Sequence, residues 1–367
     1  MRNFLFIVCL LSLSLNSANA QQKTTVYFDS LMSHHATQNF SGVLLVAKDG
    51  KAIYHKAVGF NNFADKKQLK ETDIFELASV SKQFTAMIIM MLKEKGKLNY
   101  DDKLDIYIDI PYKNISIRNL LTHTSGLPDY QEVMEKYWDK SKVAGNSDCI
   151  AYLNKYAPAK EYEPGEKYKY SNTGYLLLAS VAEKITGEDF IELCNNWIFS
   201  KLKMKNTAIR TLAEKGAIKN FAIGHYYIPK TQEYIRADSF PSSDYTIWLG
   251  NRKGPGRISS TTEDLLKWDK ALYTNKLVKQ STLSEAFKPM KLNNGTISNY
   301  GFGWQIRRDD TLGQVVSHTG DNPGYQTQII RYIDAKKTII LLNNNPYPGF
   351  SDFSEITDAT TNFLKTN

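Results

Sequence analysis

The stretch that decides the fold is Phe75-Glu76-Leu77-Ala78-Ser79-Val80-Ser81-Lys82-Gln83-Phe84-Thr85. Ser79 and Lys82 lie three positions apart in it, and residues with this spacing share one face of a helix. If a helix begins near Ser79, the Lys82 amine can reach the Ser79 hydroxyl and act as the base that a serine nucleophile needs. The neighbouring residues are apolar, so we expect the pair to lie against a core, where burial lowers the pKa of a lysine. This stretch therefore predicts a nucleophilic serine beside its base.

The pattern needs support from elsewhere in the chain. A sequence this rich in serine and lysine contains Ser-x-x-Lys about twice by chance, and Ser200-Lys201-Leu202-Lys203 is a second match. That match lies in a polar, lysine-flanked run and is typical of a solvated turn. Ser79 becomes a convincing nucleophile only if its chemical partners are present.

A candidate proton relay lies at Tyr168-Lys169-Tyr170-Ser171-Asn172-Thr173-Gly174-Tyr175, which runs directly into an apolar helix. The phenol of Tyr170 can pass a proton between a nucleophile and a leaving group, and the amide of Asn172 can hold both a lysine and a substrate carbonyl. Tyr112-Lys113-Asn114 and Tyr152-Leu153-Asn154 share the Tyr-x-Asn pattern, but neither opens a glycine-containing turn into a helix.

A third element, His318-Thr319-Gly320, ends a strand-like run within Val315–Tyr325. A glycine there lets a substrate lie against the strand edge, whose free N–H and C=O groups can pair with a peptide-like ligand. The sequence contains His-Thr-Gly once.

These three elements, in this order, resemble the active-site motifs of the serine β-lactamase and penicillin-binding protein superfamily. The resemblance is to the branch that holds class C β-lactamases, D-alanyl-D-alanine carboxypeptidases and related esterases, and it spans nearly the whole chain after residue 20. Further segments that resemble the family are Leu120–Pro128, Leu202–Thr207 and Gly254–Trp268.

The resemblance implies a role for each motif residue. Ser79 would form an acyl-enzyme, while Lys82 and Tyr170 would share the acid and base work, with either of them open as the base that takes the serine proton. The substrate-binding residues would be Asn172, His318, Thr319 and Gly320. The N–H groups of Ser79 and Asp321 would form the oxyanion hole, which stabilises a tetrahedral intermediate by about 3–4 kcal/mol.

Two departures from the family pattern narrow the expected activity. Class C β-lactamases usually carry lysine where His318 stands, and a neutral histidine gives a weaker field for a substrate carboxylate. The carboxylate of Asp321 at the cleft edge would also repel an anionic substrate. We therefore expect a D-alanyl-D-alanine carboxypeptidase-like peptidase, or a related amidase or esterase. A class C-like β-lactamase, or a penicillin-recognising sensor without turnover, are the alternatives.

The first twenty residues predict export. Arg2, an apolar run over Phe4–Leu15 and the small residues of Ala18-Asn19-Ala20 form a secretory signal peptide pattern, too short for a membrane span. We expect a periplasmic or secreted protein acting on a small peptide, ester or β-lactam substrate, including cell-wall peptides. The net charge is +8, but the basic residues are interspersed with acidic ones, which is not the clustering typical of a nucleic-acid-binding protein.

The pattern of elements predicts an α+β fold. Strand-like runs occur at both ends of the chain, joined near the start by an Asp49-Gly50 hairpin turn, and a helical stretch separates them. We expect one hydrolase domain over residues 21–367. Its sheet part covers about 21–78 and 250–367, and a mostly helical part covers about 79–249. Expected elements after the helical stretch include a capping box at Ser260–Glu263 and a strand at Tyr300–Arg307.

The remaining polar residues are expected to be structural. His123 lies in a Thr/Ser/Gly turn and is expected to be a hydrogen-bonded loop histidine. The six histidines show no metal-ligand spacing, so we predict no metal and no cofactor. Cys149 and Cys194 are left open as a disulfide or as free thiols, because an exported protein permits either.

Overall fold

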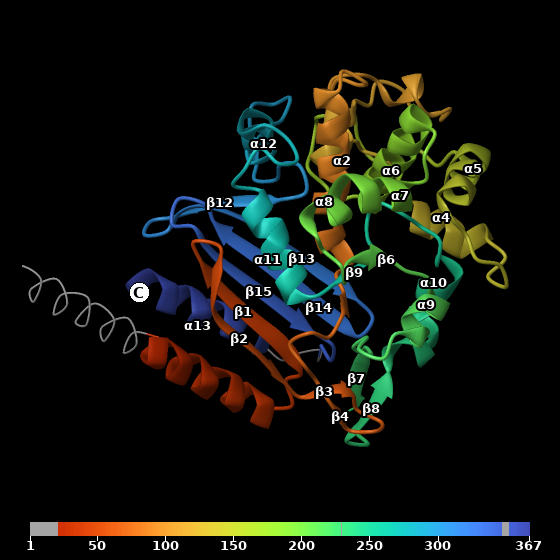
Figure 1. The fold of residues 1–367 in the computed structure, drawn as a ribbon. Coiled ribbons are helices and arrows are strands. Elements are labelled where there is room, and N and C mark those ends of the chain that lie inside the picture. The colour runs from red at the N-terminus through yellow and green to blue at the C-terminus, as the bar shows by residue number, and fades with distance from the viewer. Residues whose placement is uncertain (1–20, 229, 347–351) are drawn as a thin grey trace, which may run out of the picture.

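A computed structural model describes residues 21–228, 230–346 and 352–367 of the 367-residue chain. The predicted signal peptide, residues 1–20, lies outside these described residues. At the centre is a six-stranded antiparallel sheet in the order β12-β13-β14-β15-β1-β2 (Figure 1). Its strands are β1 (Gly42–Lys48), β2 (Lys51–Val58), β12 (Gln305–Asp309), β13 (Gly313–Asn322), β14 (Tyr325–Tyr332) and β15 (Lys337–Asn343).

The two chain ends meet in this sheet, because β1 pairs with β15 from Gly42↔Asn343 to Lys48↔Lys337. Every residue of β1 from Gly42 to Ala47 is buried. Such a continuous apolar run is expected where both faces of a strand are covered. Alternate side chains of β1 enter different cores, since Leu44 belongs to one hydrophobic cluster and Val43 and Leu45 to the other.

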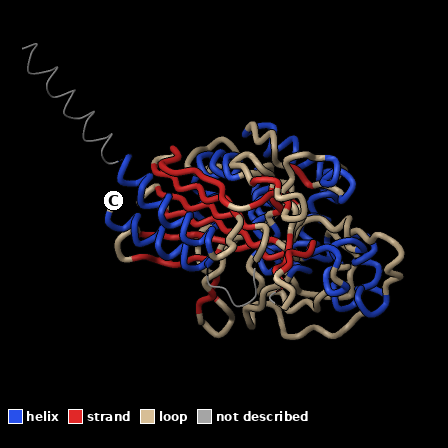
Figure 2. The backbone as a smooth tube through the Cα atoms, turned by 90° about the horizontal axis from the view of Figure 1, so that it is seen from below, coloured by secondary structure: helices blue, strands red, loops and turns tan. Residues whose placement is uncertain are grey.

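One face of the sheet is covered by the two terminal helices, residues 21–37 and α13 (Asp352–Thr366). Figure 2 shows these helices beside the sheet, and they contact each other through the stacked rings of Tyr27 and Phe363, 4.6 Å apart. The opposite face carries α2 and α11 and, beyond them, the other helices (Figure 1). The sheet is thus the middle layer of an α+β fold, as predicted.

Most helices lie between β5 and β9. They are α2 (Lys82–Glu94), α3 (Ile117–Leu121), α4 (Tyr130–Tyr137), α5 (Asn146–Tyr156), α6 (Asn172–Thr186), α7 (Phe190–Cys194), α8 (Ser200–Leu202), α9 (Leu212–Ala217) and α10 (Tyr245–Trp248), followed later by α11 (Thr262–Ala271) and α12 (Gln280–Ala286). The short strands are β3 (Phe60–Asn62), β4 (Lys67–Gln68), β5 (Phe75–Glu76), β6 (Ala208–Ile209), β7 (His225–Ile228), β8 (Glu233–Arg236), β9 (Ile258–Ser260), β10 (Met290–Lys291) and β11 (Ile297–Ser298).

Two local predictions are wrong. The strand expected at Tyr300–Arg307 begins only at Gln305, because the preceding residues turn through Gly303 at a φ of +78°. The capping box expected at Ser260–Glu263 does not form, since Thr261 is the N-cap and its side chain accepts from the N–H of Asp264.

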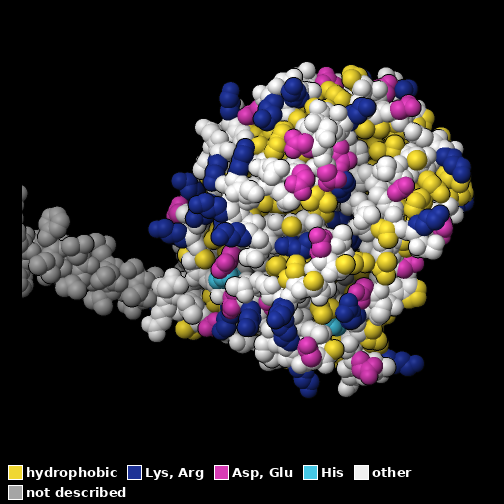
Figure 3. All heavy atoms as spheres, turned by 45° about the vertical axis from the view of Figure 1, so that its right-hand side comes forward, with side chains coloured by type: hydrophobic (Ala, Val, Ile, Leu, Met, Phe, Trp, Pro, Cys, Tyr) yellow, Lys and Arg dark blue, Asp and Glu magenta, His cyan; other side chains and the backbone are white. Residues whose placement is uncertain are grey.

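The structure also describes the two cysteines, the helix lengths, the side chains that could bind a metal, and the surface charges. Cys149 and Cys194 are both buried free thiols. In the described ranges, no helix has the length and apolarity needed to cross a membrane, and no group of metal-binding side chains gathers. On the face drawn in Figure 3, basic side chains lie among acidic ones.

Candidate active site

Ser79 lies in a tight turn between strand β5 and helix α2. A 3-10 helix (Ala78–Ser81) begins just before it, and Lys82 is the first residue of α2. Ala78 has a φ of +47°, a conformation that is uncommon for a residue with a Cβ and that often occurs at functional turns. The turn therefore holds Ser79 at a fixed, half-buried position at the N-terminus of a helix that is almost wholly buried.

The amine of Lys82 lies among three oxygens. Its Nζ is 3.1 Å from Ser79 Oγ, 2.8 Å from Asn172 Oδ1 and 2.8 Å from the carbonyl oxygen of Pro255. The amide and carbonyl oxygens can only accept hydrogen bonds, whereas the serine hydroxyl can also donate one. A neutral Lys82 amine would donate to those two oxygens and turn its lone pair toward the Ser79 hydroxyl.

Burial lowers the pKa of Lys82 well below the usual value for a lysine, and the positive charge of Arg252 lowers it further. Asp129 acts in the opposite direction. The Lys82 side chain is fully buried, and no carboxylate of the described residues forms an ion pair with it. These surroundings favour the neutral amine, which is the form that can take a proton.

Tyr170 and Asn172 reach the same point from the start of α6. Ser171 caps that helix, its side chain accepting from the N–H of Gly174, and Asn172 is the first helical residue. Burial raises the pKa of Tyr170, although a side-chain hydrogen bond with Ser79 opposes this shift. The Lys82 Nζ lies 4.7 Å from the centre of the Tyr170 ring. Tyr170 is therefore a neutral phenol in contact with both Ser79 and Lys82.

Strand β13 supplies the other predicted residues and borders the site with a free edge. Its pairing with β12 ends at Ser317, opposite Gln305, so on that side the strand from His318 to Asn322 has no partner strand. Thr319 and Asp321 are exposed, and Gly320 is buried between them. The Asp321 N–H lies in this segment and Ser79 lies in the first turn of its helix, where N–H groups lack intrahelical acceptors.

The glycine at position 320 has a packing role besides the one we predicted. A Cβ on Gly320 would lie 2.2 Å from the carbonyl oxygen of Leu77 and 3.1 Å from the Cβ of Ala78. The glycine therefore allows β13 to pack against the turn that carries Ser79, in addition to leaving the strand edge open.

His318 is placed away from direct contact with solvent. Its Nδ1–H donates to the carbonyl oxygen of Thr319 at 2.6 Å, and its Nε2 accepts from the Tyr300 hydroxyl at 2.8 Å. Burial and the nearby Lys82 lower the pKa of His318 to about 3. The histidine is therefore neutral, with both ring nitrogens engaged within the protein.

Several residues of the site were not identified from the sequence. The Pro255 carbonyl is a backbone group and carries no side-chain signal. Tyr300 lies in a segment that we predicted as a strand. His123 is a buried loop histidine whose Nδ1 accepts from the Ser171 N–H at 3.0 Å. Its ring centre is 4.3 Å from that of Tyr170, so it also positions the phenol.

The second Ser-x-x-Lys match plays no part in this site. Ser200 lies in the short helix α8, and Lys203 follows it with a φ of +56° at an exposed position. The structure thus brings Ser79, Lys82, Tyr170, Asn172 and the end of β13 together and leaves Ser200 at a surface turn.

Comparison with known proteins gives consistent matches over most of the chain. The family model described as Beta-lactamase matches residues 28–360. Penicillin-binding protein 4* of Bacillus subtilis (strain 168) is 38% identical over 329 residues, which are 89% of this chain and 72% of that protein. The D-aminopeptidase of Brucella anthropi is 24% identical over 322 residues, and the match covers 84% of this chain but only 58% of that protein.

A solved structure supports the fold. The octameric penicillin-binding protein homologue from Pyrococcus abyssi matches with a TM-score of 0.77 at 24% identity, over 92% of this chain and 76% of that one. At this identity the likeness concerns the fold alone.

Proposed function

The chain belongs to the Beta-lactamase family, and from this we propose that it hydrolyses its substrate through an acyl-enzyme on Ser79. The observation that carries the proposal is the position of the Lys82 amine. It lies 3.1 Å from Ser79 Oγ and is held by two oxygens that can only accept hydrogen bonds. We propose a D-alanyl-D-alanine carboxypeptidase-like peptidase, or a related amidase or esterase.

In the acylation step, Ser79 Oγ attacks the carbonyl carbon while its proton passes to the neutral Lys82 amine. The carbonyl oxygen becomes an oxyanion, which the N–H groups of Ser79 and Asp321 stabilise. As the bond to the leaving group breaks, Tyr170 donates its phenolic proton to the departing nitrogen or oxygen. The ammonium now present at Lys82 stabilises the negative charge left on Tyr170.

In the deacylation step, a water molecule attacks the ester carbon and its proton passes to the Tyr170 phenolate. The ester bond to Ser79 breaks, and Ser79 Oγ takes back the proton that Lys82 holds. The enzyme returns to its starting form, and the net reaction is substrate plus water giving an acid and an amine or alcohol.

The charge around the site argues against an efficient class C-like β-lactamase, which usually carries a lysine where His318 stands. A neutral, internally bonded His318 offers no positive charge to the carboxylate of a β-lactam. The side chain of Asp321 borders the same strand edge and is open to solvent on one side. Burial of the part of its carboxylate that packs against the protein raises its pKa. One relative is named a D-aminopeptidase, which supports substrates built on D-amino acids. We also propose export to the periplasm or medium, on the pattern of residues 1–20, where cell-wall peptides would be available.

Intact-mass measurement tests this proposal. We would incubate the purified protein with a fluorescent penicillin, a peptide ending in D-Ala-D-Ala and simple phenyl esters, and measure both the mass of the protein and substrate turnover. We expect a covalent adduct on Ser79, together with turnover of the peptide or an ester, and neither in Ser79→Ala. If the wild type forms no adduct and cleaves none of these compounds, the proposal is wrong.

A further inference from the structure

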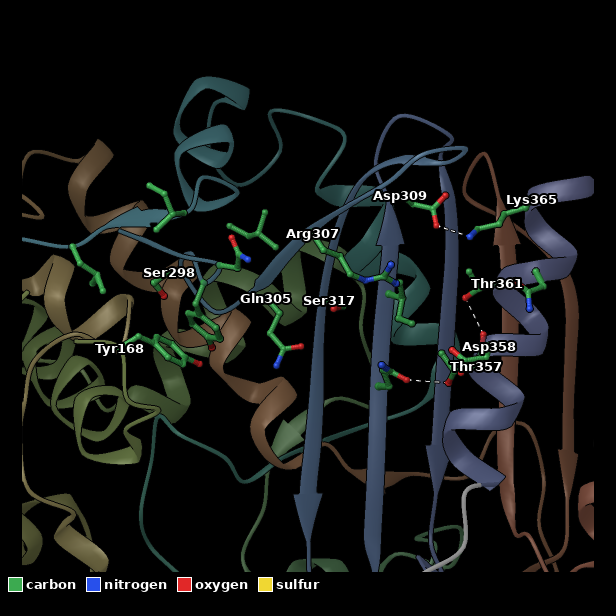
Figure 4. Close-up of a pocket in the computed structure, with 18 residues that line it drawn as sticks. Tyr168, Ser298, Gln305, Arg307, Asp309, Ser317, Thr357, Asp358, Thr361 and Lys365 are labelled. Atoms are coloured by element: carbon green, nitrogen blue, oxygen red, sulfur yellow. Dashed lines mark hydrogen bonds and ion pairs between the residues drawn. The ribbon is translucent and has the colours of Figure 1, made fainter. Parts of the chain in front are cut away.

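A second feature lies beside the catalytic residues. A cavity of about 970 Å³ opens next to Tyr168 and Tyr300 and continues along β12 toward α13. Figure 4 shows Tyr168, Ser298 and Gln305 near one end of it, with Asp309 and Lys365 at the other. Its wall mixes polar and apolar side chains. Neither the motifs nor the acyl-enzyme chemistry accounts for this space.

The position of the proton donor indicates which part of a substrate would enter the cavity. A leaving group departs beside the residue that protonates it, and that residue is Tyr170. The Tyr300 ring lies 6.4 Å from the Tyr170 ring, and the Tyr168 ring lies 5.8 Å from the Tyr300 ring, measured between centres. Since Tyr168 and Tyr300 both line the cavity, it adjoins the leaving-group side of Tyr170.

The cavity follows strand β12 away from the catalytic residues. The strand begins at Gln305, paired with Ser317 beside His318, and runs away from the catalytic residues to Asp309. Four residues of this strand line the cavity, Gln305, Ile306, Arg307 and Asp309. The exposed side chains of Gln305 and Arg307 lie on the same face, because successive side chains alternate between faces. Because a strand rises about 3.3 Å per residue, Arg307 lies about 7 Å beyond Gln305.

The charged side chains along this wall differ in whether they already form an ion pair. Asp309 is paired with Lys365 at 2.8 Å. Arg307 is exposed, hydrogen-bonds the Tyr332 side chain and forms no ion pair among the residues that the structure describes. The exposed carboxylate of Asp358, on α13, also lines the cavity. Near the catalytic end, the wall offers the amide side chains of Asn299 and Gln305, which match the donors and acceptors of a peptide backbone.

We propose that this cavity binds a peptide leaving group of about three residues, with its terminal carboxylate at Arg307. The inference rests on the proposed function, since it assigns the part of the substrate that Tyr170 releases. The enzyme would then cleave within a peptide chain, in preference to removing a single terminal residue.

The test is a series of peptides with one acyl part and leaving groups of increasing length. Acetyl-D-Ala is joined to D-Ala, D-Ala-Gly, D-Ala-Gly-Gly and D-Ala-Gly-Gly-Gly, and kcat/KM is measured for each by mass spectrometry of the products. We expect kcat/KM to rise about tenfold between the one-residue and three-residue leaving groups, as a hydrogen-bonded charge contact would give. Amidation of the three-residue terminus should remove most of that gain.

Two neighbouring arginines provide a matched comparison. Arg307→Ala should abolish the gain, whereas Arg308→Ala should keep it, because Arg308 is equally exposed on the same strand but does not line the cavity. The inference would be overturned by equal kcat/KM values along the series, or by a gain in kcat/KM that both variants change to the same extent. The proposed function would still stand in either case, provided that Ser79 cleaves the shortest peptide. Failure to cleave any member, without an adduct on Ser79, would overturn both.

Discussion

At the scale of single residues, burial has the largest effect on the pKa of Lys82, and two charged groups that do not touch it change this pKa further. Arg252 lowers its pKa, and Asp129 raises it. Arg252 is 7% exposed, and its Nη1 has no hydrogen-bond partner; its guanidinium lies 5.3 Å from the centre of the Tyr245 ring. Arg252 has no ion pair among the residues that the structure describes, and a buried cation in that state costs stability. Here its charge adds to the effect of burial in favouring the neutral form of Lys82.

The first prediction concerns the pH dependence of acylation. Lys82 must be unprotonated to act, so the rate falls as the pH drops through its pKa. Arg252→Gln removes a charge that lowers this pKa, and we expect the acid limb of the pH profile to move to higher pH. Asp129→Asn should move it to lower pH, with the cap of α4 kept because asparagine is also a good N-cap.

The measurement is the rate of Ser79 acylation by a phenyl ester between pH 4 and 10, a range of about six units that brackets the expected limb. Arg308→Gln serves as the control, because this arginine lies exposed on β12, and its limb should match the wild type. The acid limbs of the pH profiles of Arg252→Gln and Asp129→Asn could instead coincide with that of the wild type. That result would show that these two charges do not set the pKa of Lys82.

The second prediction separates the roles of Tyr170 and Lys82. Tyr170→Phe removes the proton that an amine leaving group needs, whereas a phenolate can leave without one. We expect acylation by peptides to fall by about 10²–10⁴-fold, and acylation by phenyl esters to fall far less. Lys82→Met should slow both substrates alike. Equal losses for peptide and ester in Tyr170→Phe would show that this phenol is not the proton donor.

The sequence was informative wherever chemistry depends on side-chain type in a local pattern. Ser79 and Lys82 are one turn apart, and Tyr170 and Asn172 open one helix, so their grouping could be predicted from short spacings. The carbonyl of Pro255 and the distant charge of Arg252 could not, because a backbone oxygen has no residue signature and long-range fields depend on tertiary packing.

At the scale of elements, the nucleophile turn and β13 depend on each other. Gly320 lets the strand approach Leu77 and Ala78, and the hydroxyl of Thr327 on the adjacent strand donates to the Leu77 carbonyl at 2.8 Å. The two segments whose N–H groups we propose as the oxyanion hole are therefore held by the same contact.

The third prediction follows from this contact. Gly320→Ala would place a Cβ 2.2 Å from the Leu77 carbonyl oxygen, so the turn or the strand must shift. We expect kcat/KM to fall about a hundredfold, as misplacements near 1 Å do, and the free energy of unfolding to fall by about 1–3 kcal/mol. Both are measured, by turnover and by urea unfolding.

Gly256→Ala is the matched control for this substitution. The nearest atom to a Cβ at position 256 is the Ala78 carbonyl oxygen at 3.7 Å, an ordinary contact. This variant should keep most of its activity. Full activity in Gly320→Ala, or equal losses in both variants, would contradict the proposed packing.

Elements with strong periodicity or turn chemistry could be predicted from the sequence, and irregular ones could not. The hairpin at Asp49-Gly50 was confirmed, and Gly187, in the left-handed conformation, ends helix α6 as glycine commonly does. The run before Gln305 reads as a strand because it is aromatic, but glycine backbone angles override that preference. Segment 208–250 has no clear period, and it forms short pieces such as β7 and α10, whose placement depends on the residues they pack against.

At the scale of the whole molecule, Glu76 joins three parts of the chain. It lies on β5, three residues before the nucleophile, and its carboxylate forms a buried ion pair with Lys215 of α9. It also accepts from Asn322 Nδ2, at the end of β13, at 2.9 Å. The charged groups of Lys215 and Arg257 hold the pKa of Glu76 down to about 2 against the effect of burial.

The fourth prediction concerns global stability. Glu76→Gln leaves the buried Lys215 without its anion, and we expect the free energy of unfolding at pH 7 to fall by about 3 kcal/mol. The pKa of Glu76 is lower in the folded state than in the unfolded chain, so its charge stabilises the fold above about pH 4.5. That contribution is lost as the pH falls toward 2, and the difference between wild type and Glu76→Gln should shrink over the same range.

Urea unfolding at several pH values measures both effects, and the double variant Glu76→Gln with Lys215→Met is the control. Removing the unpaired ammonium should restore part of the lost stability, because an uncompensated buried charge is more costly than an apolar side chain. Asn322 links the same carboxylate to the strand that carries Asp321, so Glu76→Gln should also slow acylation by Ser79. If the stability loss is independent of pH and the double variant recovers nothing, the ion pair does not connect these three segments energetically.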